Sequence, residues 1–391
     1  MIRQIGTPER VVRMARRHRL QPGVRTDDVA TIADDLVALH SSDPVTVYLS
    51  AMVRMRSPCV GSVERALYED RTVVRHHAMR RTLWVATPAT TRTLHAAATS
   101  RVALAEHRRT AKLLSDSGFD DPERWLADAR RQVLDVLHEH GPMTARELGR
   151  LAPALTRPIV YGAGTPAAAS QAAHTRVLLG LGFDGALVRT RPTGSWINGQ
   201  YTWAATESWV AGGFDGLDER EAARDLADHW LRRFGPATSA DLQWWTGWTV
   251  VATRRALADA GAVPVALEGG TGWVAAGDEA PVQAAEPWVA LLPGLDPTTM
   301  GWKQRDWYLP AEAADAFDRN GNAGPTIWVD GRVVGAWAQD PDGEIRTHCF
   351  VPVDPARRRE VLARAEELRG WLGSTRFRVR FPGRIQASML A

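Results

Sequence analysis

Apolar residues recur at helical spacing through most of the chain and alternate with polar residues in only a few short stretches. Ile32, Leu36 and Leu39 follow the i, i+4, i+7 pattern of a helix that buries one face. Pro44 suits the first turn of a following helix, in which the apolar content continues. The pattern therefore predicts two helices that meet at a polar corner, residues His40 to Asp43.

The N-terminal part of the chain has the order of elements found in a winged-helix domain. A basic helix is expected over residues 8–20, with Thr7 as its cap, and a short helix near residues 62–69. Residues 73–86 combine strand-forming and basic side chains, which predicts a β-hairpin. Helices followed by a hairpin are typical of a winged helix, so residues 1–118 are assigned to a first such domain.

An internal repeat predicts two further domains of the same kind. The segment GPMTAREL at residues 141–148 recurs as GPATSADL at residues 235–242, an offset of 94 residues. We expect two winged-helix domains here, over residues 119–213 and 214–284. Each copy should contain a long helix, a short helix capped by threonine, a third helix and a hairpin. In the first copy these are expected at 125–138, after Thr144, at 167–179 and at 187–203. In the second copy they are expected at 219–234, after Thr238, at 250–258 and at 263–274.

The last hundred residues have a different pattern. Short strand-like segments are separated by Asp-Gly turns at Asp330 and Asp342, which favour tight hairpins. Residues 285–391 are therefore expected to form a small antiparallel β-barrel or sheet with a terminal helix. The expected strands are 288–292, 326–329, 333–338, 345–351 and 376–380, and the expected helix is 355–372. The predicted fold class is α+β.

Composition limits the possible partners and compartment. The 391 residues include 48 Lys and Arg against 45 Asp and Glu, a net charge of +3 that does not by itself demand a polyanion. Residues 1–25, however, contain seven arginines and only one acid, Glu9. Two cysteines form no disulfide framework, and neither a signal peptide nor an apolar run of about 18 residues is present. We expect a monomer in the cytoplasm that has no membrane contact.

Several motifs in the sequence bear on cofactor binding. Residues 162–167 (GAGTPA) superficially match a dinucleotide fingerprint, but no βαβ unit surrounds them, so we interpret them as a loop that enters a helix. His76 and His77, like His138 and His140, lack the carboxylate or thiol partners of a zinc site. No Walker loop or Gly-x-Ser-x-Gly motif is present. We therefore expect neither a metal nor a cofactor.

Tryptophans and arginines point to nucleic acid. Of 16 tryptophans, Trp244, Trp245 and Trp248 cluster; the spacing places Trp244 and Trp248 on one helix face and favours a core position over base stacking. Any one arginine could be a solvated surface charge, but their recurrence in wings and third helices favours double-stranded DNA as the partner. The candidate DNA-binding arginines are Arg80, Arg81, Arg176, Arg189 and Arg191.

The most specific motif lies near the C-terminus. Residues 291–303 read LLPGLDPTTMGWK and are followed by RDWY at 305–308 and WVDGRVVG at 328–335. With these segments the chain resembles the bacterial winged-helix DNA glycosylases of the AlkZ/YcaQ-like family over nearly its whole length. The resemblance implies three winged helices and a C-terminal β-barrel element that together form a concave DNA surface. It also implies that Lys303 and Arg305 lie beside DNA, although Trp302 and Trp307 could instead be core anchors.

The resemblance places the family's catalytic motif, Gln-apolar-Gln or Gln-apolar-Asp, at His40, Ser41 and Ser42, so both polar positions differ here. A cationic alkylpurine is a good leaving group, and the protein must mainly hold a water and tolerate an oxocarbenium-like sugar. His40 is interpreted as the acceptor of the water proton, Ser42 as its orienter and Asp43 as the stabiliser of the sugar cation. His40 should titrate near about pH 6.5, or higher beside Asp43. The alternative is that Asp43 caps the helix and the other two satisfy backbone groups.

The leading hypothesis is a DNA glycosylase that hydrolyses the N-glycosidic bond of alkylated or bulky-adduct purines, in DNA repair or genotoxin resistance. One alternative is a non-catalytic DNA-binding protein or regulator on the same scaffold. Another is a protein-interaction platform, which would not bind DNA in a salt-dependent way.

Overall fold

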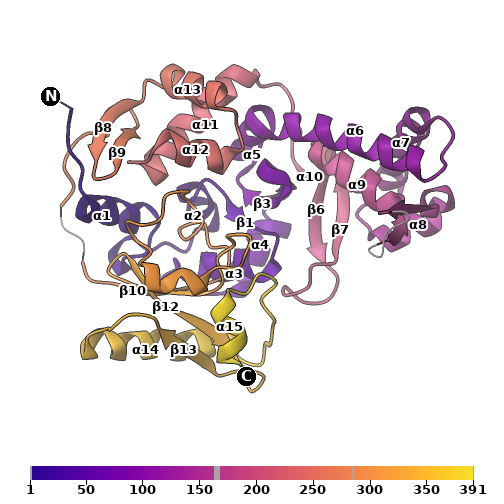
Figure 1. Cartoon of the computed structure of the whole chain (residues 1–391). Coiled ribbons are helices and arrows are strands. Elements are labelled where there is room, and N and C mark those ends of the chain that lie inside the picture. The colour runs from indigo at the N-terminus through magenta and orange to yellow at the C-terminus, as the bar shows by residue number, and fades with distance from the viewer. Residues whose placement is uncertain (1, 163–167, 284–285, 391) are drawn as a thin grey trace.

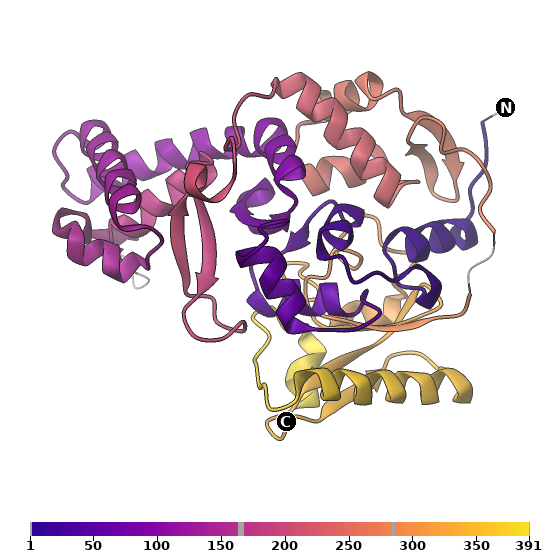
Figure 2. The same ribbon diagram turned by 180° about the vertical axis from the view of Figure 1, so that it is seen from behind.

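Helices and small antiparallel sheets share the chain, so the α+β prediction is confirmed. The computed structural model describes residues 2–162, 168–283 and 286–390. Figures 1 and 2 show an elongated molecule, in which α6 (Ser100–Asp116) leads to an arm of α7 (Pro122–His140) and α8 (Ala145–Leu151). The C-terminal sheet with α14 (Pro355–Leu372) lies along one side of the main body. Among the described residues, no helix is both long enough and apolar enough to cross a membrane.

The N-terminal part differs from prediction at the polar corner. The helix expected to reach Leu39 ends at Asp35, and the fully buried Val37 turns the chain with a φ of 59°. Leu39 and His40 then form a two-residue strand that pairs with Val85 and Trp84. The elements here are α1 (Thr7–Arg17), η1 (Pro22–Val24), α2 (Val29–Asp35), β1 (Leu39–His40), α3 (Pro44–Met52), α4 (Val60–Tyr68), β2 (Val74–His77), η2 (Met79–Arg81) and β3 (Leu83–Ala86).

The predicted hairpin at residues 73–86 is present as β2 and β3, and it belongs to a larger sheet. That sheet has five strands in the order β1-β3-β2-β6-β7. The second hairpin, β6 (Leu187–Pro192) and β7 (Tyr201–Ala205), joins the first through one register pair, Arg75 with Arg189. The first and second units of the chain are therefore connected by backbone hydrogen bonds as well as by a linker.

The internal repeat is visible in the backbone. Thr144 and Thr238 each form a capping box at the start of a short helix, with Glu147 and Asp241 as the reciprocal partners. The equivalent residues Met143 and Ala237 each form a bridge to a tryptophan of the following hairpin. The copies comprise α7 (Pro122–His140), α8 (Ala145–Leu151) and α9 (His174–Phe183) before β6 and β7, and α11 (Glu219–Phe234), α12 (Ser239–Thr246) and α13 (Val250–Asp259) before β8 (Val263–Leu267) and β9 (Gly270–Val274). Their assignment as winged-helix domains stays a prediction.

One helix of the first copy begins later than predicted. The helix expected at residues 167–179 starts at His174, and residues 169–172 instead form β5 (Ala169–Ala172), which pairs with β4 (Pro158–Tyr161). Most of the glycine-rich segment 162–167 lies outside the described residues, which resume at Ala168. The remaining helices of this region are η4 (Pro153–Thr156), α5 (Pro88–Leu94), the π-helical turn η3 (His95–Thr99) and α10 (Thr206–Trp209).

The C-terminal strands form an open sheet. They pair in chain order, so β10 and β13 lie at opposite edges and the sheet alternative holds over the barrel. The strand expected at residues 376–380 is absent because backbone N–H groups of Phe377 and Arg380 donate to side chains, not to a neighbouring strand. The elements are β10 (Val289–Leu292), η5 (Ala311–Ala316), β11 (Thr326–Val329), β12 (Arg332–Gln339), β13 (Ile345–Cys349), α14 (Pro355–Leu372) and α15 (Arg384–Met389).

Two large apolar clusters place the N-terminal elements against the rest of the molecule. One joins Trp84 to Trp230, Trp245 and Trp302, and thereby links the first sheet, α11, α12 and the C-terminal region. The other packs α2, α3 and α4 against the C-terminal sheet and α14. Trp248 is buried as expected, whereas the most buried member of its group is Trp245 and not Trp244, which is half-buried. The corner at His40 thus stands on a packed support.

Candidate functional site

The polar corner lies where β1 ends and α3 begins. His40 is the last residue of β1, and the Ser41 N–H donates to the Leu83 carbonyl at 2.8 Å. Asp43 is the N-cap of α3 and Pro44 occupies its first turn, as the sequence predicted. The corner is thus fixed by strand pairing on one side and by a helix cap on the other.

His40 lies in an apolar environment that keeps its imidazole neutral. Its ring meets the Trp84 ring edge-on at 4.7 Å, and the residue is 5% exposed. Burial, and secondarily the charge of Arg80, lowers the pKa of His40 to about 3. The expectation that Asp43 would raise this pKa is wrong, because burial dominates. His40 Nδ1 accepts a hydrogen bond from the Ser42 N–H at 3.3 Å, which assigns the ring proton to Nε2.

Asp43 is buried but keeps acceptor capacity. Its Oδ1 accepts from the Val45 N–H at 3.3 Å and its Oδ2 from the Arg380 N–H at 2.9 Å. Burial raises the pKa of this carboxyl, while the two N–H donors and the Arg380 charge oppose the rise. A carboxylate has about four lone-pair sites, so two remain for a further donor. Asp43 therefore caps α3, as expected, and is also the carboxylate of the corner.

The two serines face different partners. Ser41 is buried, and its Oγ accepts from Arg75 Nε at 2.9 Å. Ser42 is half-buried, and its Oγ lies 3.5 Å from the Leu83 N–H. Ser42 is thus the member of the corner that most nearly reaches solvent.

Two arginines that meet across the sheet stand behind the corner. Arg75 is 1% exposed and has no carboxylate in ion-pair distance among the described residues; it binds the Tyr68 hydroxyl at 2.8 Å, and its Nη2 is buried without a partner. Arg189 is its register partner on β6, and burial lowers the pKa of Arg189 to about 10. The ring of Tyr201 lies 4.4 Å from the Arg75 guanidinium and 5.8 Å from that of Arg189. Like charges directly opposite on neighbouring strands repel, so the sheet retains them at a cost to stability.

The tip of the first hairpin carries two predicted residues. Arg80 and Arg81 both have positive φ, 54° and 62°. The Arg80 guanidinium stacks on Trp244 at 4.3 Å, and burial lowers its pKa to about 10. Arg81 is exposed and pairs with Glu106 at 2.7 Å. Arg80 thus belongs to the surroundings of His40, while Arg81 points to α6.

Two other predicted arginines are engaged by acids. Arg176 is buried and pairs with Glu106 at 2.8 Å, so its charge is neutralised inside the protein, and we do not include it in the DNA contacts proposed below. It lies on α9, which packs on α6 and α7 and so exposes little of its face. Arg191 is exposed and lies 3.7 Å from Glu64 and 3.6 Å from Glu69. Arg189 and Arg191 share β6, but only Arg189 lacks a carboxylate partner among the described residues.

Lys303 and Arg305 lie on a loop near α12. Lys303 is exposed, and its backbone N–H donates to Asp241 at 2.9 Å. Arg305 donates from Nε to the Trp302 carbonyl at 3.0 Å and stacks on Phe317 at 4.6 Å. Trp302 is 1% exposed and is a core anchor, as the alternative reading held.

The signature motif supports the corner from below. Asp296 and Arg54 form an ion pair at 2.8 Å, with side chains 0% and 1% exposed. Ser50 Oγ also donates to Asp296, at 2.6 Å, and Thr46 Oγ1 donates to the Gly294 carbonyl at 2.6 Å. These contacts fix α3, whose first residue follows Asp43, to the loop of residues 294–298.

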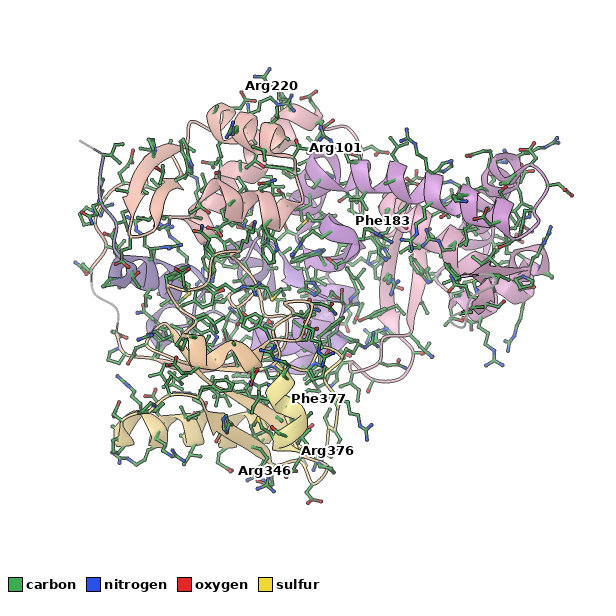
Figure 3. The ribbon with its side chains drawn as sticks, in the orientation of Figure 1. Arg101, Phe183, Arg220, Arg346, Arg376 and Phe377 are labelled. Atoms are coloured by element: carbon green, nitrogen blue, oxygen red, sulfur yellow. The ribbon has the colours of Figure 1, made fainter. Side chains whose placement is uncertain are left out.

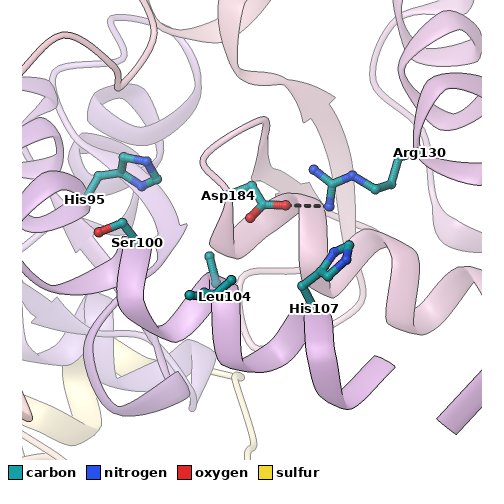
Figure 4. A pocket seen from close by; sticks show the side chains of 7 residues that line it. His95, Ser100, Leu104, His107, Arg130 and Asp184 are labelled. Carbon is teal, nitrogen blue, oxygen red and sulfur yellow. Dashed lines mark ion pairs between the residues drawn. The ribbon is translucent and has the colours of Figure 1, made fainter. Parts of the chain in front are cut away.

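A separate open pocket of about 440 Å³ lies at the base of the arm (Figure 4). His95, His107 and the ion pair of Arg130 with Asp184 line it, and no residue of the corner does. Within residues 2–162, 168–283 and 286–390, no group of three or more His, Cys, Asp or Glu is placed to hold a metal ion.

Comparisons with known proteins bear on the family and the fold. The family model "DNA glycosylase AlkZ-like" matches residues 33–371. Among solved structures, the Streptomyces sahachiroi DNA glycosylase AlkZ matches with a TM-score of 0.72 and 19% identity, over 97% of this chain and 99% of that chain. No curated protein sequence matches the chain.

Proposed function

Because the chain belongs to the AlkZ-like DNA glycosylase family, we propose that it hydrolyses the N-glycosidic bond of alkylated or bulky-adduct purines in double-stranded DNA, at the corner of His40, Ser42 and Asp43. The observation that carries the proposal is the environment of this corner. It combines a neutral histidine, a half-buried hydroxyl and a carboxylate with raised pKa, next to arginines that have no acidic partner among the described residues.

The roles follow from the two pKa shifts. A histidine whose pKa is about 3 is a weak base, and its Nδ1 is already an acceptor for Ser42, so His40 serves as a donor through Nε2–H that positions the water. Asp43 has the higher proton affinity that a base needs. Water oxygen bonds to the sugar C1′, the bond from C1′ to the purine nitrogen breaks, and Asp43 takes the water proton. Before attack, the same carboxylate stabilises the positive charge on the sugar.

The test is base release. The purified protein is incubated with duplex that contains N7-methylguanine or N3-methyladenine, and abasic sites are quantified by strand cleavage after alkali. We expect release by the wild type, and a rate lower by about 10²–10⁴-fold in Asp43→Asn, which retains the helix cap. Arg359→Ala, an exposed change on α14, is the matched control.

One observation favours the non-catalytic alternative, namely that both polar positions of the family motif differ here. If the wild type binds duplex and releases no alkylpurine, and His40→Gln with Ser42→Gln restores release, the chain is a DNA-binding protein on a glycosylase scaffold. If the wild type does not bind duplex at all, the proposed function is overturned.

A further inference from the structure

The segment between α14 and α15 runs alongside the corner of His40 to Asp43. Residues 375–383, here called the C-terminal strap, form neither helix nor strand. Gln339 holds its beginning, since Gln339 Nε2 donates to the Thr375 carbonyl at 3.0 Å and the Phe377 N–H donates to Gln339 Oε1 at 3.2 Å. Figure 3 labels Arg376 and Phe377 at this point, beside the C-terminal sheet.

Arg380 brings the strap into contact with the corner. Its N–H donates to Asp43 Oδ2 at 2.9 Å, and its Nη1 donates to the Ser42 carbonyl at 3.4 Å. Gly199, in the loop between β6 and β7, allows this approach, because a Cβ there would overlap the Arg380 guanidinium. A Cβ at Gly294 of the signature loop would lie 3.3 Å from Cγ1 of Val379, so this loop also packs closely against the strap. The strap therefore lies where the corner, the second hairpin and the signature loop meet.

Exposure alternates along the strap. Arg376, Arg378 and Arg380 are exposed, whereas Phe377 and Val379 between them are half-buried. Such alternation is what an extended segment with one packed face produces, so the three arginines share the solvent side.

The three arginines are not equally free. Arg376 donates to the carbonyls of Gly373, Thr375 and Asp342, which fixes the turn after α14. Arg378 makes no side-chain hydrogen bond or ion pair within the described parts of the chain, and Arg380 has only its carbonyl contact to Ser42 there. Exposed arginines elsewhere in the protein commonly face a carboxylate, as Arg220 faces Asp259 and Arg369 faces Glu366.

Unpaired guanidinium groups at this place favour a phosphate ligand. A guanidinium presents five donors in a planar fork that matches phosphate oxygens, and Arg380 uses one of them. Arg189 lies close enough for its charge and that of Arg380 to interact, so the surroundings are cationic. The Asp43 carboxylate accepts from the backbone N–H of Arg380 and not from its guanidinium.

We propose that Arg378 and Arg380 bind backbone phosphates beside the nucleotide that enters the corner, so that the C-terminal strap is part of the DNA-binding site. This inference rests on the proposed function. It assigns two roles to Arg380. Its guanidinium binds the DNA strand, and its backbone N–H positions Asp43. Phosphate binding and the orientation of the catalytic carboxylate are therefore coupled through one residue.

The test measures duplex affinity against salt concentration for wild type, Arg378→Ala, Arg380→Ala and the control Arg359→Ala. Each lost phosphate contact should reduce the slope of log K against log salt by about 0.9, while Arg359→Ala keeps the wild-type slope. Arg380→Lys retains the charge and should restore most of the slope. Alanine at 380 keeps the N–H that binds Asp43, so base release at saturating DNA should fall less than affinity does.

A second pair of measurements keeps the result independent of folding. Gly199→Ala removes no charge but displaces the Arg380 guanidinium, and it should weaken duplex binding in the wild type and have little further effect in Arg380→Ala. A neutral methylphosphonate placed beside the lesion should likewise weaken the wild type and leave Arg380→Ala unchanged. The inference is overturned, while the proposed function stands, under the following result. The wild type binds duplex, and the losses of affinity caused by Arg380→Ala and by a methylphosphonate are additive at every flanking position. If the wild type binds no duplex, the proposed function itself fails.

Discussion

Asp296→Asn should be one of the most destabilising single changes that leave side-chain volume intact. Asp296 Oδ1 accepts a hydrogen bond from Arg54 Nη2 at 2.8 Å, and Oδ2 accepts one from Arg54 Nη1 at 2.9 Å. Ser50 Oγ also donates to Oδ2. The Thr298 N–H completes the set at 2.9 Å. The amide of asparagine would replace one acceptor oxygen with a donor that faces other donors, and it would leave the Arg54 charge buried without a counter-charge.

Removal of one partner from a buried ion pair typically costs about 3–5 kcal/mol. We expect Asp296→Asn to lower the free energy of unfolding by this amount, which is roughly a 10²–10⁴-fold shift of the folding equilibrium. Urea titration followed by tryptophan fluorescence measures it, with Asp259→Asn as the control. That residue pairs with the exposed Arg220, and solvent screens such a pair, so its loss should lower the free energy of unfolding far less than Asp296→Asn does.

A double change separates the pair from the site. Replacement of both members by apolar residues, Arg54→Met with Asp296→Leu, removes the buried charges together and should cost less than Asp296→Asn alone. If the free energy of unfolding of Asp296→Asn lies within about 1 kcal/mol of the wild-type value, the reasoning is refuted. The signature aspartate is then not what holds α3 to the loop of residues 294–298.

Three further outcomes are expected. Stability should fall on acidification. Burial lowers the pKa of the four most deeply buried histidines below the value of about 6.5 that they have in the unfolded chain, so the unfolded state binds protons first. Their contribution to stability is complete above that pH and is lost below it. A melting temperature that is constant from pH 7 to pH 5 would contradict this for His18, His40, His76 and His77. Base release should show no step near pH 6.5 and should instead rise with pH through the Asp43 pKa, which burial raises above the usual aspartate range; a midpoint at 6.5 that disappears in His40→Ala would restore a titrating histidine. Gly182→Ala should destabilise by about 1–3 kcal/mol because its Cβ would overlap the buried His77 ring, and a Tm equal to that of Gly180→Ala, where a Cβ meets only Arg130, would refute the clash.

Local signals explain what could be predicted from the sequence. The threonine caps at 144 and 238 carry their own partners three residues later, and the helix at 355–372 has a proline start and a regular charge pattern, so these elements were recognised. The cap at Asp43 was found for the same reason. Each depends on residues within one or two helical turns.

Other features depend on distant partners. Strand β1 exists only because β3 lies beside it, and a two-residue strand has no periodicity to detect. The pKa of His40 was predicted in the wrong direction because the neighbour in sequence, Asp43, matters less than burial against Trp84. Arg75 and Arg380 were missed altogether, since Arg380 meets Asp43 across 337 positions of the chain.

The register pair between Arg75 and Arg189 has a mechanical consequence. A flexible linker would let the arm of α7 and α8 swing freely, but strands β6 and β2 share one sheet with β3 and β1. We expect a displacement of the arm to be transmitted through the backbone hydrogen bonds of this sheet toward His40. The sheet keeps the arm and the corner at a fixed separation. A ligand that contacts both must therefore adapt its own curvature to the protein.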